Sequence, residues 1–302
     1  MSEKTQLEKV LEQNEEYQEV RAMNGMGGEV QAVLDRISSH VCVQLSPEDI
    51  VAHVRTVYDE IAEEYAARSV RQYVPAALLH FMKLPHFRDG DRIIDLGCGP
   101  NVHDAIFLSR PDRKMRFALM GCLQTGAVSC GHLHIPNNGF DVLAVDGSPR
   151  IAELATRRLK IKKDEWLDGD SFFFRSRVAY ADIHCVSAAI NETFHGAWSC
   201  AALFTHTPRA LIQHAFLSLA VVLEPKGIFA VSYPSGREGE YDNLRYQQQM
   251  GRVKYFSRPQ ASVIASEALA AGFHLIHESQ GDVDRERRIQ KDLFTTQFFQ
   301  KC

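Results

Sequence analysis

The sequence predicts an α/β fold in which helices cover both faces of a mostly parallel sheet. From residue 91 onward, short apolar runs alternate with segments of helical periodicity. The runs expected to be strands are RIIDLG, DVLAVDG, SFFFRSRVAYAD, GAWSCAALF and GIFAVSY, and the expected helices between them include PRIAELATRRLK and RALIQHAFLSLAVVLE. Strands that alternate with helices form parallel βαβ units. At the C-terminal end, FHLIHESQG and LFTTQFFQK instead predict an antiparallel hairpin at the sheet edge.

Residues 1–45 are expected to form a helical cap. Residues 4–38 are charged and have apolar residues at helical spacing, and NGMGG interrupts them, so we expect two helices there. A further helix is predicted to begin after Ser46, because Pro47 suits the first helical position and acidic residues follow in the first turn. The remaining domain is expected to span residues 46–302.

Composition narrows the classes of function, although it does not exclude specific RNA binding. The chain of 302 residues, 45% hydrophobic, is long enough for one large or two small domains. Its net charge of −4 is dispersed, which predicts no general attraction to nucleic acid or to membranes. The seven cysteines form no CxxC pair and suit reduced thiols. No apolar run approaches the roughly 20 residues of a membrane span, and the start is too polar for a signal peptide, so we expect the cytoplasm.

A glycine turn follows the first expected strand, in DLGCGPN. In an open α/β sheet, ligands bind beyond the carboxyl ends of the strands, and glycine lets a ligand approach the backbone. Gly97 and Gly99 suit this position, although a tight turn alone explains them equally well. Val102 stands where a dinucleotide fingerprint needs its third glycine, so the turn does not predict a pyrophosphate site.

Acidic residues end the next two strands. Asp146 ends VLAVD, where a carboxylate accepts hydrogen bonds from a ribose diol, and Asp182 in AYADIH is placed to accept one from an adenine amino group. Helix N-capping is the alternative for each acid taken singly. The ordered series of glycine turn and two acids nevertheless points to a nucleoside without a bridging diphosphate.

The ordered segments IIDLGCGPN, VLAVDGSP, ADIH, CAALFTHTP and EPKGIFAVS resemble the motif series of class I S-adenosylmethionine-dependent methyltransferases, over about residues 51–302. YDEIAEEY is similar to the YDxxAxxY segment that precedes the core in many small-molecule members. The resemblance implies a Rossmann-like, doubly wound sheet of seven strands whose last strand is antiparallel. It also implies S-adenosyl-L-methionine as the cofactor.

The resemblance assigns roles around that cofactor. Gly97 and Gly99 approach its methionine portion, with Asp95 near the amino group. The ribose is held by Asp146, the adenine is framed by Asp182 with Ile183, and two tyrosines close over the whole. The implied set is Tyr58, Tyr65, Asp95, Gly97, Cys98, Gly99, Asp146, Gly147, Ser148, Asp182, Ile183 and Ala201. For the tyrosines, an aromatic core of an amphipathic helix is the alternative.

Methyl transfer to an acceptor mainly requires alignment and exclusion of water. His206 in LFTHTP occupies the position of the histidine in the LEHVP stretch of many relatives, at the rim of the pocket. It is the candidate catalytic base for the acceptor, with a structural histidine that holds the loop as the alternative.

The segment at about 234–258 resembles the variable substrate-side cap of the family. The candidate substrate-binding residues are Tyr233, Arg245, Arg252 and Tyr255, and a solvated charged face is the alternative for this segment. No DPPY or NPPY follows the fourth strand, which disfavours amino methylation of nucleic-acid bases or of protein glutamine. No Pro-Cys nucleophile stands there either, which disfavours methylation of cytosine carbon.

Gly97 and Asp146 lie further apart than the roughly twenty residues usual in the family, so residues at about 111–137 are an insertion. A surface loop, an oligomer contact and translated intron sequence are its open explanations. Cys122, Cys130, His132 and His134 within it match no common zinc spacing, and we expect no metal site.

The sequence therefore predicts methyl transfer from S-adenosylmethionine to an oxygen or nitrogen atom of a small molecule. One alternative is an RNA or protein methyltransferase, which a concentrated basic rim would favour. The other is a non-catalytic, cofactor-binding regulatory or assembly protein on the same fold. Membranes and nucleic acid are not expected partners, and a homodimer stays open.

Overall fold

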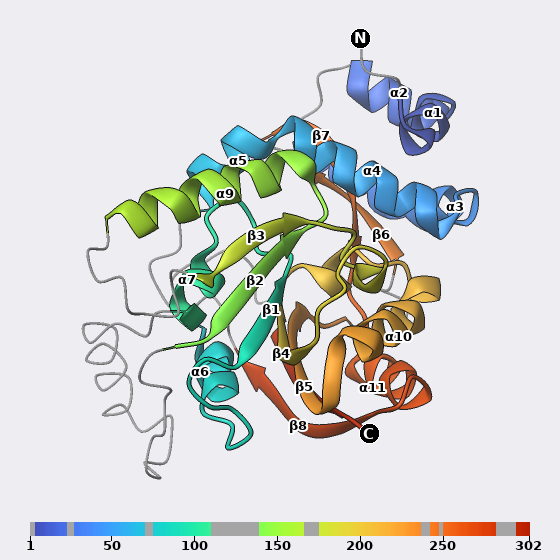
Figure 1. Cartoon of the computed structure of the whole chain (residues 1–302). Helices are drawn as coiled ribbons and strands as arrows, with labels where there is room; N and C mark the ends of the chain where they lie inside the picture. The colour runs from blue at the N-terminus through green and yellow to red at the C-terminus, as the bar shows by residue number, and fades with distance from the viewer. Residues whose placement is uncertain are drawn as a thin grey trace.

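A seven-stranded sheet forms the centre of the molecule, with strand order β3-β2-β1-β4-β5-β9-β8 (Figure 1). The computed structural model describes residues 4–22, 27–69, 75–109, 139–165, 175–236, 242–247, 250–281 and 294–302. The strands are β1 Arg92–Leu96, β2 Asp141–Asp146, β3 Arg177–Tyr180, β4 Phe194–Cys200, β5 Leu223–Pro234, β8 Phe273–Gly281 and β9 Phe294–Lys301. Strands β1 to β5 are parallel, and β9 runs antiparallel to both β5 and β8. The predicted α/β fold and terminal hairpin are confirmed.

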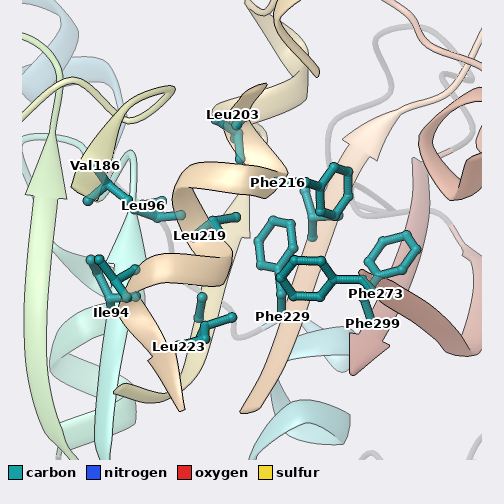
Figure 2. Packing of buried hydrophobic residues seen from close by; sticks show 14 of the residues in the cluster. Ile94, Leu96, Val186, Leu203, Phe216, Leu219, Leu223, Phe229, Phe273 and Phe299 are labelled. Atoms are coloured by element: carbon teal, nitrogen blue, oxygen red, sulfur yellow. The ribbon is translucent and has the colours of Figure 1, made fainter. Parts of the chain in front are cut away.

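Alternate residues of the central strands enter two different cores, as expected for a sheet covered on both faces. Ile94 of β1 packs with α10 (Ile212–Val222) and α11 (Ala261–Ala270), in the cluster that Figure 2 shows around Phe216 and Phe229. Ile93 packs on the opposite face. The helices of that face are α6 Ala76–Met82, α7 His103–Ser109 and α9 Pro149–Asp164.

The helix start predicted after Ser46 is confirmed: α4 spans Pro47–Glu60, and the Ser46 hydroxyl accepts a hydrogen bond from the Asp49 N–H at 3.0 Å. The helical segment breaks at Ile61, and α5 (Ala62–Arg68) follows. Short 3₁₀ helices lie in the loops: η2 Val186–Ala188 between β3 and β4, and η3 Leu203–Thr205 and η4 Arg209–Leu211 between β4 and α10.

Residues 4–43, where described, form three helices rather than the two predicted. They are α1 Gln6–Glu12, α2 Glu15–Ala22 and α3 Gly27–Val43. The extra boundary lies at Asn14, whose side-chain oxygen accepts a hydrogen bond from the Tyr17 N–H at 3.0 Å. This contact caps the start of α2 and ends the helical run that the apolar spacing alone suggested.

A second sheet of two strands, β6 (Asp242–Gln247) and β7 (Arg252–Ser257), packs on α3 and α4. Leu244 and Tyr255 enter a third buried cluster with residues of α1 to α4. The expected substrate-side cap therefore contains an antiparallel hairpin that joins the N-terminal helices in one core. The domain boundary at residues 45/46 stays a prediction, and the expected insertion at 111–137 lies outside the described residues.

Within the described parts of the chain, no helix is both long and apolar enough to cross a bilayer.

Candidate functional site

The glycine turn lies where β1 ends, between β2 and β4. Gly97 and Gly99 both have left-handed backbone, with φ of +75° and +65°. The N–H groups of Gly97 and Cys98 donate to the Val145 carbonyl at 2.8 and 3.0 Å. The turn is thus fixed against the end of β2, and glycine meets its backbone requirement without strain.

The two glycines have different surroundings. A Cβ atom at Gly97 would lie 2.1 Å from the Cβ of Ala202, because the loop after β4 packs directly on the turn. Ala201 in that loop itself has a positive φ of 53°. At Gly99, no atom of the described residues other than Gly99 and its two chain neighbours lies within 4 Å of the place a Cβ would take. Gly97 therefore serves close packing, and Gly99 borders the open space that a ligand needs to reach the backbone.

Asp146 joins the end of β2 to the glycine turn. Its Oδ2 accepts a hydrogen bond from the Gly99 N–H at 3.1 Å, and its Oδ1 accepts one from the Ser148 N–H at 3.0 Å. Burial raises the pKa of Asp146 to about 6, although these backbone donors act in the opposite direction. Gly147 lies between Asp146 and Ser148 in the chain, and Ser148 caps α9 through its hydroxyl. The acid is positioned as predicted for a ribose ligand, and that role stays a prediction.

Asp182 follows β3 and forms a pair with His184. Its Oδ1 accepts hydrogen bonds from the backbone N–H and the Nδ1–H of His184, each at 2.9 Å. These bonds hold the pKa of Asp182 down to about 2. Ile183 between them lies beside Gly97, with its Cδ1 3.9 Å from the place of a Cβ there. Ile183, one of the two residues predicted to frame the adenine, therefore adjoins the glycine turn.

Asp95 is 2% exposed at the end of β1. The neighbouring Ser199 hydroxyl donates to the Leu96 carbonyl at 2.9 Å and accepts from the Leu203 N–H at 3.2 Å, which ties β1 to the loop after β4. Burial raises the pKa of the Cys98 thiol, so this residue stays uncharged at neutral pH.

The α4–α5 segment covers this end of the sheet beside α9 (Figure 1). Asp59 Oδ1 accepts hydrogen bonds from the Ser148 hydroxyl at 2.5 Å and the Arg150 N–H at 3.1 Å. On the other side, the Asn101 amide donates to the Ala66 carbonyl and to the Ser69 hydroxyl, both at 2.9 Å. The segment that carries Tyr58 and Tyr65 is thus held both to the start of α9 and to the glycine turn.

A chain of hydrogen bonds runs beneath this cover. The Lys254 Nζ donates to the Tyr58 hydroxyl at 3.0 Å, and that hydroxyl lies 3.0 Å from His206 Nε2. His206 Nδ1 lies 2.9 Å from the carbonyl oxygen of Tyr255. A carbonyl only accepts, so Nδ1 carries the proton and Nε2 accepts from Tyr58. Tyr65 completes the group, with its ring centroid 5.4 Å from that of Tyr58.

Burial determines the charges in this group. It lowers the pKa of His206 to about 3, with the nearby Lys254 charge acting in the same direction. It also lowers the pKa of Lys254 to about 8, against a weaker opposing effect of Tyr65. The pKa of Tyr58 is raised, again by burial first. His206 is therefore neutral near pH 7, and Lys254 is the group whose charge changes just above it.

The four candidate substrate residues separate into two pairs. Tyr233 and Tyr255 are 0% exposed. The Tyr233 hydroxyl donates to Gln297 Oε1 at 2.6 Å, and Tyr255 packs in the buried cluster formed with α1 to α4. Neither ring has surface for an acceptor in this structure. Arg252 pairs with Glu60 at 3.0 Å, and Arg245 lies over the Phe256 ring at 5.7 Å. Both arginines lie on the hairpin, and a substrate role for them stays a prediction.

Lys254 is the site residue that sequence reasoning missed. Neighbouring residues of β7 point to opposite faces, so Tyr255 enters the buried cluster formed with α1 to α4 while Lys254 reaches Tyr58. The alternation in RVKYFS was the available signal.

A cavity of about 620 Å³ lies between the N-terminal helices and the segment after His206. Its lining includes Cys42, Pro47 and Ile50 on one side, and Pro208 and Arg209 on the other. None of the residues predicted to hold the cofactor lines it, so it is separate from the predicted cofactor site.

No protein-family model matches the sequence, and a search of curated proteins finds no match. Solved structures do match in three dimensions. Magnesium protoporphyrin IX methyltransferase from Synechocystis PCC 6803, solved with bound SAM, is similar with a TM-score of 0.53 and 12% identity, over 85% of this chain and 98% of that one.

The [4+2]-cyclase SpnF is similar with a TM-score of 0.52 and 13% identity, over 83% of this chain and 96% of that one. The 1,6-didemethyltoxoflavin-N1-methyltransferase of Burkholderia thailandensis, solved with 1,6-didemethyltoxoflavin and S-adenosylhomocysteine, is similar with a TM-score of 0.50 and 17% identity, over 85% of this chain and 91% of that one. At such low identity these similarities establish architecture and not activity. The chain has the Rossmann-like fold of class I S-adenosylmethionine-dependent methyltransferases.

Proposed function

We propose that this protein transfers the methyl group of S-adenosylmethionine to an oxygen or nitrogen atom of a small molecule. The observation that carries the proposal is the pairing of Asp146 with Gly99 at the carboxyl ends of β2 and β1. This is the crevice in which open α/β sheets bind ligands.

The residues present fit the cofactor. Gly99 leaves open space beside the backbone, Asp146 supplies acceptor oxygens next to it, and Ile183 gives an apolar surface beside Gly97. When bound, S-adenosylmethionine supplies an electrophilic methyl group on a sulfonium. The chain's contribution is to orient both reactants and to exclude water, and the tied α4–α5 cover suits that task.

A small acceptor is supported by the buried surroundings of the Tyr58–His206 pair. It is also supported by two structural neighbours, a 1,6-didemethyltoxoflavin-N1-methyltransferase and a magnesium protoporphyrin IX methyltransferase. The hairpin and the N-terminal helices would enclose such an acceptor. A larger acceptor, an RNA or a protein, would need an open basic rim, and the arginines of the hairpin are engaged with Glu60 and Phe256.

A second candidate is a protein of the same fold that binds the cofactor without transferring its methyl group. The similarity to a [4+2]-cyclase supports this second candidate, because that neighbour has the same architecture and is named for a reaction other than methyl transfer.

The test is turnover with S-adenosylmethionine that carries an isotopically labelled methyl group, against a panel of small phenols, hydroxy acids and amines. Our proposal predicts S-adenosylhomocysteine and a labelled small product in equal amounts. Tight cofactor binding with no labelled product from the panel or from small-molecule extracts would favour the second candidate, and label in RNA or protein would contradict the small-molecule assignment.

A further inference from the structure

Lys254 is a buried amine without a carboxylate partner among the described residues. Lys254 is 8% exposed. Its Nζ donates a hydrogen bond to the Tyr58 hydroxyl and lies 5.0 Å from the centroid of the Tyr58 ring. Buried lysines are uncommon unless they are paired, and those that are not paired readily lose their charge. This environment is typical of a lysine that works as a base.

Titratable and charged groups from four elements surround Lys254. They are Tyr58 from α4, Tyr65 from α5, His206 from the segment after η3, and Arg245, the cross-strand neighbour of Lys254 on β6. Two residues further away change the pKa values of these neighbours: Asp146 raises that of Tyr58, and His184 lowers that of His206. Tyr58 and His206 are uncharged near pH 7 and Arg245 is a cation, so among these groups Tyr65 alone favours the charged form of Lys254, and its effect is weaker than that of burial.

His206 suits a positioning role better than that of the base. Its Nδ1 donates to the Tyr255 carbonyl and its Nε2 accepts from Tyr58, so both ring nitrogens are used. Its pKa of about 3 also makes it a weak base near pH 7. His206 instead directs the Tyr58 hydroxyl, and the oxygen of that hydroxyl holds the lysine amine.

We propose that Lys254 is the general base of the methyl transfer, with Tyr58 and His206 as its positioning residues. The inference rests on the proposed function, in which Tyr58 and Tyr65 close over the cofactor and Lys254 thereby faces the methyl group. The acceptor oxygen or nitrogen bonds to the methyl carbon, and the carbon–sulfur bond breaks with its electron pair passing to sulfur. The acceptor's proton passes to the Lys254 Nζ, which becomes an ammonium and later releases that proton to solvent.

The sulfonium gives this arrangement a signature that needs no acceptor. A protonated Lys254 and a sulfonium at close range repel each other, whereas S-adenosylhomocysteine has no such charge. The affinity for S-adenosylmethionine therefore rises with pH as Lys254 loses its proton, relative to the affinity for S-adenosylhomocysteine. Changes that affect both ligands equally cancel in this comparison. Asp146, with a pKa of about 6, is already mostly ionised over the pH range used, and its contribution is the same in the Lys254 variants.

The experiment is calorimetric titration of both ligands from about pH 6.5 to about pH 9.5, around the pKa of about 8 given by burial. For the wild type, the ratio of the S-adenosylmethionine to the S-adenosylhomocysteine dissociation constant falls roughly tenfold or more across this range. Lys254→Gln is neutral and gives a low ratio of the two dissociation constants, whereas Lys254→Arg stays charged and gives a high ratio. Neither ratio changes with pH. Thermal unfolding confirms that each variant is folded, and the arginine variant keeps the test valid if the glutamine variant is not.

Tyr58→Phe separates positioning from mere packing. The ring remains, but the oxygen that accepts from the ammonium is lost, so the midpoint of the wild-type pH dependence moves to lower pH while the dependence itself persists. An unchanged midpoint contradicts the positioning role of the hydroxyl.

Turnover supplies the second readout. In the wild type kcat rises with pH through about 8. Near pH 9.5, where Lys254 is uncharged, Lys254→Gln loses roughly 100-fold or more in kcat with little change in KM for the cofactor. Parallel pH profiles for the two ligands in the wild type, or a kcat within about threefold of wild type in the variant, would overturn this inference alone. Failure of the folded wild type to bind either ligand would overturn the proposed function, and this inference with it.

Discussion

Asp146 Oδ2 accepts a hydrogen bond from the Gly99 N–H at 3.1 Å, and this contact joins the ends of the two strands that border the proposed cofactor site. The same carboxyl group has a pKa raised to about 6 by burial. A ribose diol donates to a carboxylate, so the ionised form of Asp146 is the one that binds.

The first prediction concerns the pH dependence of cofactor binding. Between pH 7 and pH 5 Asp146 takes up a proton, and the affinity for S-adenosylhomocysteine falls about tenfold as a result. Calorimetry at a series of pH values measures it. Asp146→Asn is the matched control and has a weak affinity that is flat over this range; a wild-type affinity that is also flat would show that Asp146 is not the ribose acceptor.

The second prediction compares the two glycines of the turn. Both Gly97→Ala and Gly99→Ala place a side chain on left-handed backbone, which costs roughly 1 to 2 kcal/mol. At Gly97 the new methyl group also collides with Ala202, which adds about 1 to 3 kcal/mol. Urea unfolding should therefore show Gly97→Ala as the less stable variant. Equal losses would mean that the loop after β4 moves aside freely.

The third prediction concerns the cover formed by α4 and α5. Asp59→Ala removes the acceptor for the Ser148 hydroxyl and the Arg150 N–H, and should lower the free energy of unfolding by about 1 to 2 kcal/mol. Since the cover is then held less firmly, the dissociation rate of S-adenosylhomocysteine should also rise in stopped-flow displacement. Glu64→Ala is the control, because it removes only an exposed ion pair with Arg68 and should change stability by less than about 0.5 kcal/mol.

The fourth prediction concerns stability in acid. The pKa of His206 is about 3 in the folded protein, below the roughly 6.5 of an unfolded chain. As pH falls below about 6.5, the unfolded state therefore takes up a proton that the folded state does not, and stability is lost. At pH 5 this loss amounts to about 2 kcal/mol relative to pH 7. Denaturant unfolding of His206→Gln at both values should show a smaller loss by that amount, and an unchanged loss would contradict the burial of an uncharged His206.

The fold was predictable because its signals are local. The apolar run of β1 and the glycines behind it specify a strand and a left-handed turn without reference to the rest of the chain. The same holds for Ser46 and Ser148, whose hydroxyls cap α4 and α9. The acids at the strand ends were found in sequence because the carboxyl ends of parallel strands meet at one edge of the sheet.

The features that were missed depend on tertiary contacts. The β6–β7 hairpin is stabilised by packing on α3 and α4, more than 180 residues earlier in the chain, as the pairing of Gln31 with the Leu244 carbonyl at a separation of 213 residues illustrates. Lys254 is not predicted from the sequence for a similar reason, because its partner Tyr58 lies 196 residues away in the chain. The place of Tyr233 and Tyr255 in a motif predicts substrate residues, whereas their burial follows from neighbours that the motif does not contain.

Calorimetric titration of the wild-type protein and of Asp146→Ala with S-adenosylhomocysteine, near pH 7.5, tests the central claim most directly. We predict micromolar affinity for the wild type and a loss of at least about 100-fold in the variant, because the ribose then loses its charged acceptor beside Gly99. Absence of binding to a wild-type protein that is shown to be folded, or equal binding by the variant, would contradict the account.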